Sequence, residues 1–240
     1  MFCRKVAHLN SHCQDYGSCP DYSSQEEYGI CIHETETRWI LTMKRAGIEK
    51  RYWKIEFETL VDSIKQTEAY RKAISYVQQL SKMFQHGYGF GLFGGNGVGK
   101  TSLLCCILKA VLRKGYSALL IEAPEVPLIL NRWKTKKAED NQGDSLEERL
   151  FQDDFLLLDD LGAESSVEYS MACIQQVVLR RVNEMKPILF TSDLTPEEMA
   201  HRWMQAGYNR VYDRLRTGSF ISYLEGENLR ERKACLLYYK

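Results

Sequence analysis

A glycine-rich segment in the middle of the chain places the strongest constraint on the fold. The residues GGNGVGKTS, Gly94–Ser102, satisfy the pattern G-x-x-x-x-G-K-[ST] in full. They follow the apolar run GFGLF and precede the helical run TSLLCCILKAVL, which is the strand–loop–helix context of a phosphate-binding loop. In such a loop, backbone N–H groups face the phosphates and the helix adds the positive end of its dipole. The segment therefore predicts binding of a nucleoside triphosphate, ATP with Mg²⁺.

Two side chains in this loop have expected roles. Lys100 is expected to reach the β- and γ-phosphates, and the hydroxyl of Thr101 is expected to ligate Mg²⁺. The alternative, a glycine-rich turn with a chance lysine, is disfavoured by the flanking strand and helix. The predicted nucleotide-binding residues are Gly94, Gly95, Asn96, Gly97, Val98, Gly99, Lys100, Thr101, Ser102 and Asp159.

A second acidic element follows the loop along the chain. The run FLLLDD, Phe155–Asp160, is an apolar strand that ends in two carboxylates, the form of a Walker B motif. Asp159 is expected to hold Mg²⁺ through water, and Asp160 to orient the attacking water as its base. The two acids could instead cap the next helix. Behind a complete phosphate-binding loop, we favour the metal and catalytic roles.

The order of apolar segments predicts the fold class. From Tyr88 onward, apolar strands alternate with helices, which indicates an α/β fold with a parallel sheet covered by helices on both faces. The expected strands are Gly89–Phe93, Ala118–Glu122, Phe155–Leu158, Pro187–Thr191 and Phe220–Leu224. The expected helices are Lys100–Lys114, Glu125–Trp133, Ser170–Met185 and Thr195–Ala206. The stretch Lys134–Ser145 is polar and is expected to form a loop.

The chain before the sheet divides into two parts. Residues 1–34 are polar and rich in Cys, His, Tyr and Ser, and residues 35–86 have an amphipathic helical pattern with a turn expected at Gly47. We predict a small Cys/His head over 1–34, a helical linker over 35–59 and the ATPase core over 60–240. The sequence shows no apolar run of eighteen residues and no signal-peptide core, so we expect a cytoplasmic protein without a membrane partner.

Four segments in this order resemble one protein family. They are the phosphate-binding loop, LLLDDLGAE (Leu156–Glu164), PILFTSDLTPEEM (Pro187–Met199) and RVYDRLRTGSF (Arg210–Phe220). Together they resemble bacterial helicase loaders of the DnaC/DnaI type and the related ATPase subunits of IS21-type transposons. The stretch AGIEKRYWKIEFETL (Ala46–Leu60) resembles the family's lead-in, with Glu49 where proline is common. The likeness covers about residues 40–230.

This resemblance implies a P-loop AAA+ core of the initiator clade without a C-terminal lid. It also implies self-association into an ATP-dependent oligomer on DNA, and a replicative helicase hexamer as partner. At the sensor-1 position the family usually has the Asn of a TSN run, whereas this chain has Asp193. A carboxylate near the γ-phosphate is repelled unless it is protonated or faces a cation, so hydrolysis is expected to be slow. Asp193 could instead belong to the N-cap region of the helix that starts near Thr195.

The same resemblance assigns a role to an arginine near the end of the core. Arg214 matches the family's arginine finger, which reaches the ATP of a neighbouring subunit. Arg210 and Arg216 flank it and could be solvated surface charges. The predicted catalytic residues are Asp160, Asp193 and Arg214.

The N-terminal segment predicts a metal site. Four of the eight cysteines lie in the first 31 residues, and a reducing compartment favours metal ligation over disulfides. The set Cys13, Cys19, Cys31 and His33 can supply three thiolates and an imidazole for tetrahedral Zn²⁺. Cys3, His8 or His12 could replace one member of this set. Reduced cysteines without a ligand, and an iron–sulfur cluster, are the alternatives.

A basic segment predicts contact with single-stranded DNA. The formal net charge is zero, so any such contact requires a local patch. In the stretch LNRWKTKK, Arg132, Lys134 and Lys136 surround Trp133, which offers charge for phosphates and a ring face for a base. The alternative is a solvated helix end with a half-buried tryptophan.

Several functions fit these features. The leading prediction is an ATP-dependent helicase loader in DNA replication, and the closest alternative is a transposon-encoded DNA-targeting ATPase of the IS21 type. The Cys/His head favours the loader. A P-loop kinase for a small molecule is disfavoured by the Walker B run and by the segment that contains Arg214. A binding adaptor with a degenerate site is the fourth alternative, because Asp193 replaces the expected amide.

Overall fold

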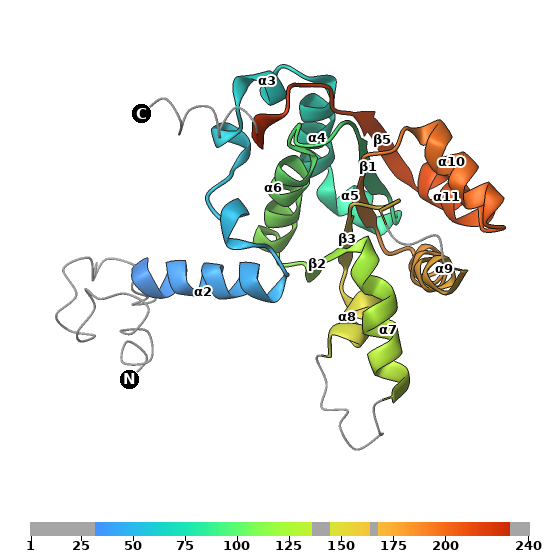
Figure 1. The fold of residues 1–240 in the computed structure, drawn as a ribbon. Helices are drawn as coiled ribbons and strands as arrows, with labels where there is room; N and C mark the ends of the chain where they lie inside the picture. Colours follow the sequence, from blue (N-terminus) through green and yellow to red (C-terminus); the bar gives the residue numbers. More distant parts are fainter. Residues whose placement is uncertain (1–31, 136–144, 164–167, 231–240) are drawn as a thin grey trace. The chain divides into compact units, whose positions relative to one another are not determined.

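The computed structural model describes residues 32–135, 145–163 and 168–230. The chain forms two compact units, Met1–Trp53 and Lys54–Lys240 (Figure 1). Nearly all of the predicted Cys/His head lies outside the described residues, so the boundaries predicted at 34 and 59 remain predictions. Within the described ranges, no helix is long and apolar enough to cross a membrane.

The described part of the first unit is a helix followed by a tight turn. Helix α2 (Ile32–Arg45) ends just before Gly47, whose φ of 76° allows the chain to reverse. The 3₁₀ helix η1 (Lys50–Tyr52) follows, and the indole N–H of Trp53 donates to the carbonyl oxygen of Ile48 at 2.8 Å. The expected helix and the turn at Gly47 are both confirmed.

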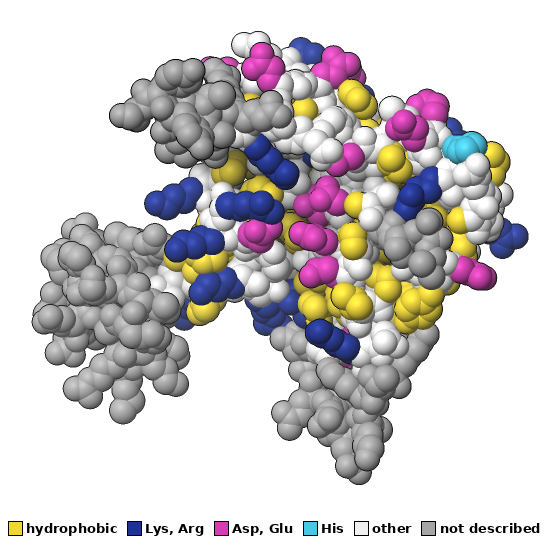
Figure 2. All heavy atoms as spheres, viewed as in Figure 1, with side chains coloured by type: hydrophobic (Ala, Val, Ile, Leu, Met, Phe, Trp, Pro, Cys, Tyr) yellow, Lys and Arg dark blue, Asp and Glu magenta, His cyan; other side chains and the backbone are white. Residues whose placement is uncertain are grey.

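The last part of this unit carries an excess of positive charge, although Met1–Trp53 as a whole has seven basic and seven acidic residues. Five Lys or Arg residues and one acid, Glu49, fall between residues 37 and 53, although the whole chain has no net charge. Figure 2 shows Lys and Arg side chains gathered over α2. Lys44 Nζ lies 5.6 Å from the centre of the Trp53 ring, and Arg51 pairs with Glu49 at 2.6 Å. Residues 37–53 therefore carry more positive than negative charge, within a chain whose formal net charge is zero.

The second unit is built on a five-stranded parallel sheet. The strands have the spatial order β2-β3-β4-β1-β5, and every pair is parallel. Their bounds are β1 (Gly89–Phe93), β2 (Ala118–Glu122), β3 (Phe155–Asp159), β4 (Ile188–Ser192) and β5 (Ser219–Tyr223). All residues of β1, β3 and β4 are buried, which explains their continuous apolar runs. Each expected strand is confirmed to within one residue at either end.

Helices cover both faces of this sheet (Figure 1). Helices α4 and α6 pack on one face, whereas α9 and α11 pack on the other, with α7 against α9 and α10 against α11. The helical bounds are η2 (Phe57–Thr59), α3 (Asp62–Lys65), α4 (Glu68–Gln78), α5 (Leu80–Gln85), α6 (Lys100–Arg113), η3 (Ala123–Glu125), α7 (Val126–Thr135), α8 (Leu146–Gln152), α9 (Glu168–Asn183), α10 (Pro196–Gln205) and α11 (Asn209–Thr217). The predicted α/β fold with a helix-covered parallel sheet is confirmed.

Two helices were not expected from the sequence pattern. Helix α8 has seven residues, too few to show a clear period, and it begins where the Ser145 hydroxyl accepts from the backbone N–H of Glu148. Helix α11 is strongly polar and buries only Val211 and Leu215, which are four residues apart. Arg214 therefore lies inside a helix, not after the last one as the sequence pattern suggested.

A buried arginine joins several elements of the core. Arg181 on α9 is fully buried and donates to the carbonyl oxygens of Leu150 at 3.0 Å, Asp154 at 3.1 Å and Pro187 at 3.2 Å. Burial lowers the pKa of its guanidinium to about 10, partly offset by nearby carboxylates such as Asp153. This side chain holds the amino ends of β3 and β4 against α9.

Candidate nucleotide-binding site

The phosphate-binding loop connects the carboxyl end of β1 to the first residue of α6. At two positions of this loop, steric contacts and a positive φ require glycine. Gly97 has a φ of 76°, and a Cβ there would collide with the Asn228 side chain. Gly99 has a φ of 103°, and a Cβ there would lie 2.6 Å from Ile64 Cδ1. The loop can therefore adopt this path only with glycine at both positions.

The segment after β5 also contacts the loop. The backbone N–H of Leu229 donates to the carbonyl oxygen of Gly97 at 3.0 Å. The N–H of Leu224 donates to the carbonyl oxygen of Phe93 at 2.7 Å, just before the loop begins. Residues 224–229 thus run along the loop and limit its movement.

Lys100, at the start of α6, is held by three acceptors. Its side chain is 5% exposed, and Nζ donates to the carbonyl oxygens of Gly94 at 2.9 Å and Gly95 at 2.8 Å. The third acceptor is Oδ1 of Asp193 at 2.5 Å. The cation that the sequence assigns to the phosphates therefore lies inside the loop, with a carboxylate beside it.

The carboxyl ends of the strands bring the other predicted residues to the same edge. Phe93 of β1 is in register with Ser192 of β4, and β4 also pairs with β3, whose last residue is Asp159. Thr101 Oγ1 donates to Asp159 Oδ1 at 3.0 Å, so the predicted Mg²⁺ ligand and the Walker B acid are in direct contact. Hydroxyl and carboxylate oxygens are the ligand types that Mg²⁺ prefers, so these two residues fit the ion.

Thr191 of β4 is a residue of this site that sequence reasoning missed. Its hydroxyl donates to Asp159 Oδ1 at 2.6 Å and accepts from the backbone N–H of Asp160 at 2.9 Å. Burial raises the pKa of Asp159, the bond from Thr191 lowers it, the charge of Asp160 raises it and the bond from Thr101 lowers it, with a net upward shift. A buried hydroxyl between two strand ends carries no sequence signal beyond its place in the TSD run.

Asp160 follows β3 in an unusual backbone conformation. Its φ is 54°, in the left-handed region that residues with a side chain rarely adopt. The N–H of Leu161 donates to the carbonyl oxygen of Thr191 at 2.8 Å, and the N–H of Ala163 donates to that of Asp160 at 3.0 Å. These bonds hold the strained turn. Such strain is concentrated at functional sites, which agrees with the role expected for Asp160.

The structure also identifies the cap of α10. Thr195 is its N-cap: its hydroxyl accepts from the N–H of Glu198 at 3.2 Å, and the Glu198 carboxylate accepts from the Thr195 N–H at 2.8 Å. Asp193 makes no part of this capping box. Asp193 lies two residues before this N-cap and forms an ion pair with Lys100.

Arg214 and its neighbours lie on the surface of α11. Arg216 pairs with Asp213 at 3.6 Å, and Arg214 and Arg210 are exposed. Among the described residues, no ion pair or side-chain hydrogen bond of Arg214 is seen.

The remaining predicted sites lie at or beyond the limits of the described chain. Arg132 is an exposed residue of α7, which also contains Trp133 and Lys134, whose side chains are not described. Lys136, Cys13, Cys19 and Cys31 lie outside the described residues, and the side chain of His33 in α2 is not described. No group of three or more His, Cys, Asp or Glu suited to a metal ion occurs in the part of the chain that is described.

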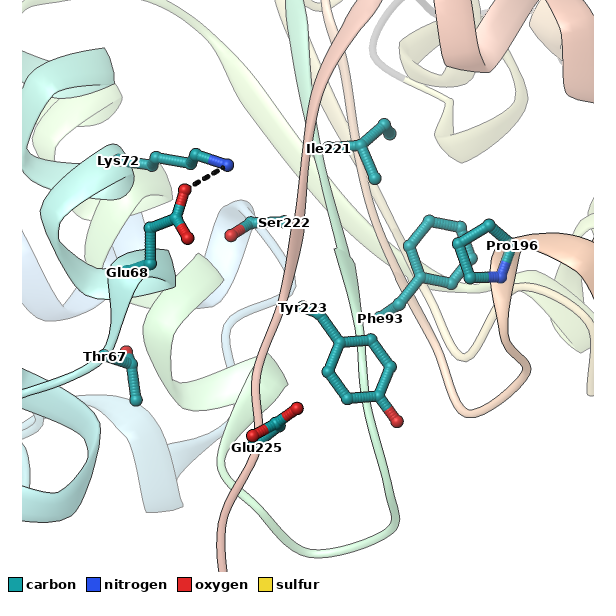
Figure 3. A pocket seen from close by; sticks show the side chains of 9 residues that line it. All are labelled: Thr67, Glu68, Lys72, Phe93, Pro196, Ile221, Ser222, Tyr223 and Glu225. Carbon is teal, nitrogen blue, oxygen red and sulfur yellow. Dashed lines mark ion pairs between the residues drawn. The ribbon is translucent and has the colours of Figure 1, made fainter.

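An open pocket of about 470 Å³ lies beside this site, around the end of β5 (Figure 3). Phe93, the last residue before the loop, and the exposed Tyr223 form part of its wall. Its one cation, Lys72, lies 2.8 Å from Glu68 and is neutralised there. The phosphates are therefore expected in the loop and not in this pocket.

The sequence as a whole matches a known family. Residues 50–235 match the family of IstB-like ATP binding proteins. The replicative helicase loader DnaC of Escherichia coli (strain K12) is 29% identical over 186 residues, which span 75% of this chain and 70% of DnaC. The replicative helicase loader DnaI of Bacillus subtilis (strain 168) is 31% identical over 156 residues, or 60% of this chain and 48% of DnaI.

Solved structures share the fold. The crystal structure of the DnaC helicase loader matches with a TM-score of 0.63 at 20% identity. The match covers 74% of this chain and 100% of the DnaC chain in that structure. The replication initiator DnaA bound to AMPPCP and single-stranded DNA matches with a TM-score of 0.57 at 19% identity, over 75% of this chain and 51% of DnaA. The family match extends over more than half of the chain and includes every element of the loop site. This chain therefore belongs to the family of IstB-like ATP binding proteins and is an AAA+ ATPase of the DnaC/DnaI type.

Proposed function

We propose that this protein is an ATP-dependent helicase loader in DNA replication, which binds Mg-ATP, single-stranded DNA and a replicative helicase hexamer. One observation carries the proposal: a complete phosphate-binding loop contacts a Walker B acid through Thr101 and Asp159, in a chain whose relatives are replicative helicase loaders. The paired hydroxyl and carboxylate supply the Mg²⁺ ligands, and the loop supplies the phosphate site. Nucleotide binding is the switch through which the loader would act.

The catalytic residues that we propose are Asp160, Asp193 and Arg214. Asp160 is the base that orients the attacking water, and its strained turn at the end of β3 fixes its position. Arg214 stabilises the transferring phosphate of the ATP bound to the next subunit, and its exposed position on α11 supports this role. Asp193 takes the sensor-1 position, where it faces Lys100 and limits hydrolysis.

The proposal includes two further ligands. Single-stranded DNA binds along α7 and the residues after it, through Arg132, Trp133, Lys134 and Lys136. A zinc ion bound by Cys13, Cys19, Cys31 and His33 folds the N-terminal head, which contacts the helicase. The exposed position of Arg132 supports the first of these sites.

A second candidate function follows from the family match. The matching family is named for IstB-like proteins of IS21 elements, so a transposon-encoded DNA-targeting ATPase shares this core. The two functions differ in their partner. A loader requires a helicase ring, whereas a targeting ATPase requires a transposase and double-stranded DNA.

Loading of a ring onto a strand without ends distinguishes these functions. A hexameric helicase cannot pass onto closed circular single-stranded DNA unless its ring is opened. The purified host helicase, the circle and Mg-ATP are mixed with this protein, and helicase bound to the circle is measured after gel filtration. We expect loading by the parent protein and none by Lys100→Ala. If the helicase neither binds the parent protein nor reaches the circle, the loader function is wrong.

A further inference from the structure

The ammonium of Lys100 has no hydrogen-bond donor left for a ligand. A lysine ammonium has three N–H donors, and here they meet Gly94 O at 2.9 Å, Gly95 O at 2.8 Å and Asp193 Oδ1 at 2.5 Å. Before Lys100 can donate to a phosphate oxygen, at least one of these three bonds must break. The protein itself thus supplies a full set of acceptors to the residue that should hold the nucleotide.

The three acceptors are not equally easy to displace. Two are backbone carbonyls of the loop, whose path is fixed by the glycines and by contacts with residues 224–229. The third is the side chain of Asp193, which is 38% exposed and can turn toward water, where its charge is well solvated. Lys100 itself is only 5% exposed, so it needs an anionic partner when the site holds no phosphate. Asp193 is therefore the partner that a phosphate would replace.

The charge of Asp193 affects ATP and ADP differently. A P-loop lysine contacts both the β- and the γ-phosphate. ADP makes only the first of these contacts, so the displaced Asp193 carboxylate can stay near Lys100 in the space that a γ-phosphate would occupy. ATP uses both contacts and brings the γ-phosphate to the carboxylate, which adds repulsion between like charges.

We propose, resting on the function proposed above, that Asp193 is an intramolecular competitor of the γ-phosphate for Lys100 and thereby shifts the nucleotide preference of this site toward ADP. The carboxylate acts as a substitute anion in the resting site. Either nucleotide replaces the bond between Asp193 and Lys100, but only ATP also places a γ-phosphate against the carboxylate. An amide at this position would compete more weakly, because its oxygen can accept from Lys100 but carries no net charge to repel the γ-phosphate.

The test measures nucleotide preference in Asp193→Asn. Calorimetric titration in the presence of Mg²⁺ gives the affinities for ADP and for the non-hydrolysable analogue AMPPCP. We expect the affinity of the variant for AMPPCP to rise about tenfold and its affinity for ADP to change by less than about threefold. The expected changes are moderate because the Asp193 carboxylate is partly exposed and water screens its charge. Asp193→Ser removes the same charge with a smaller side chain and should shift the ratio in the same direction.

A matched variant controls for the loss of a carboxylate. Glu184→Gln removes an exposed carboxylate that pairs with Arg180 and Lys186 at the end of α9, and it should leave both affinities unchanged. The inference is overturned if Asp193→Asn and Asp193→Ser, both folded by circular dichroism, bind AMPPCP no more tightly than the parent or shift both nucleotides equally. If the parent and every variant bind neither nucleotide, the proposed function fails together with the inference.

Discussion

Thr101 Oγ1 lies 3.0 Å from Asp159 Oδ1 and donates a hydrogen bond to it. This bond joins the first turn of α6 to the end of β3, and its two residues are 58 positions apart in the chain. Thr191 donates to the same oxygen at 2.6 Å, so Asp159 is held from two sides before any ion arrives. The Mg²⁺ ligands that we propose, Thr101 and Asp159, are therefore already in contact, so they would need little rearrangement on binding.

Lys100→Ala should abolish tight binding of ATP and leave the fold intact. The substitution removes the charge that the phosphates require, and the bonds lost are two to loop carbonyls and one to the partly exposed Asp193. Equilibrium dialysis with labelled ATP measures the effect, and circular dichroism checks the fold. Lys114→Ala, which removes an exposed lysine just after α6, is the control and should bind like the parent. Equal binding by Lys100→Ala would show that the loop is not the phosphate site.

Asp159→Asn should stabilise the metal-free protein while it removes Mg²⁺-dependent binding. The pKa of Asp159 is higher in the folded protein than the ordinary value of 3.8. The unfolded chain therefore releases this proton more readily, and the buried carboxylate costs stability at pH values above the unfolded pKa. In EDTA at pH 7 the variant should have a higher free energy of unfolding than the parent, a gain that disappears below about pH 4.

Urea denaturation with and without Mg-ATP measures both parts of this prediction. The parent protein should be stabilised by Mg-ATP, because a ligand that binds the folded state stabilises it. The variant should not be stabilised by Mg-ATP, because it lacks the carboxylate that we expect to hold Mg²⁺. A variant that is less stable than the parent in EDTA would contradict the stated cost of the buried charge.

The N-terminal head should contain one zinc ion per chain. Three thiolates and an imidazole from Cys13, Cys19, Cys31 and His33 complete a tetrahedral structural site. Elemental analysis of protein purified without added metal should give about one zinc per chain, and Cys13→Ser should lower this value. Cys235→Ser, a cysteine outside the set, is the control. A metal-free protein that is fully folded and active would contradict the predicted zinc site.

Trp133→Ala should weaken binding to single-stranded DNA by about 1–3 kcal/mol, the usual contribution of one stacked base. Trp133→Phe keeps an aromatic face and should retain most of the affinity. Fluorescence anisotropy with a labelled oligonucleotide measures both variants with and without ATP, which should strengthen binding. Unchanged affinity in Trp133→Ala would place this side chain outside the DNA site.

Arg214→Ala should bind ATP normally as a monomer but lose ATP-dependent assembly and hydrolysis. The side chain is exposed on α11 and does not contact the loop of its own chain in the described structure. A guanidinium suits a role at the next subunit because its planar fork pairs with phosphate oxygens. Arg216→Ala removes a neighbouring arginine that pairs with Asp213, and it is the matched control.

Mixing two inactive proteins tests whether Arg214 acts on a neighbour. In a mixture of Arg214→Ala and Lys100→Ala, some interfaces combine the intact loop of the first with the intact arginine of the second. We expect partial recovery of ATPase activity on mixing. No recovery, in mixtures that light scattering shows to co-assemble, would indicate a structural role for Arg214.

The amino-acid sequence alone was enough to predict those elements that local patterns define. Strands β1, β3 and β4 are continuous apolar runs because both of their faces are buried, so their positions were predictable to within one residue. The phosphate-binding loop was predictable because its glycines must occupy fixed positions between a strand and a helix. Helix α11 was not, because two buried residues, Val211 and Leu215, leave almost no apolar period.

The tertiary structure decided which residues meet at the strand ends. Lys100 and Asp193 are 93 residues apart, and only the adjacency of β1 and β4 in a parallel sheet brings them to 2.5 Å. The adjacency of β3 and β4 places Thr191 against Asp159 in the same way. Local sequence determines a strand or a loop through its own burial and backbone angles, whereas strand order depends on how all the elements pack together. The sequence therefore predicted a phosphate site around Lys100, and the packing of the sheet pairs this lysine with Asp193.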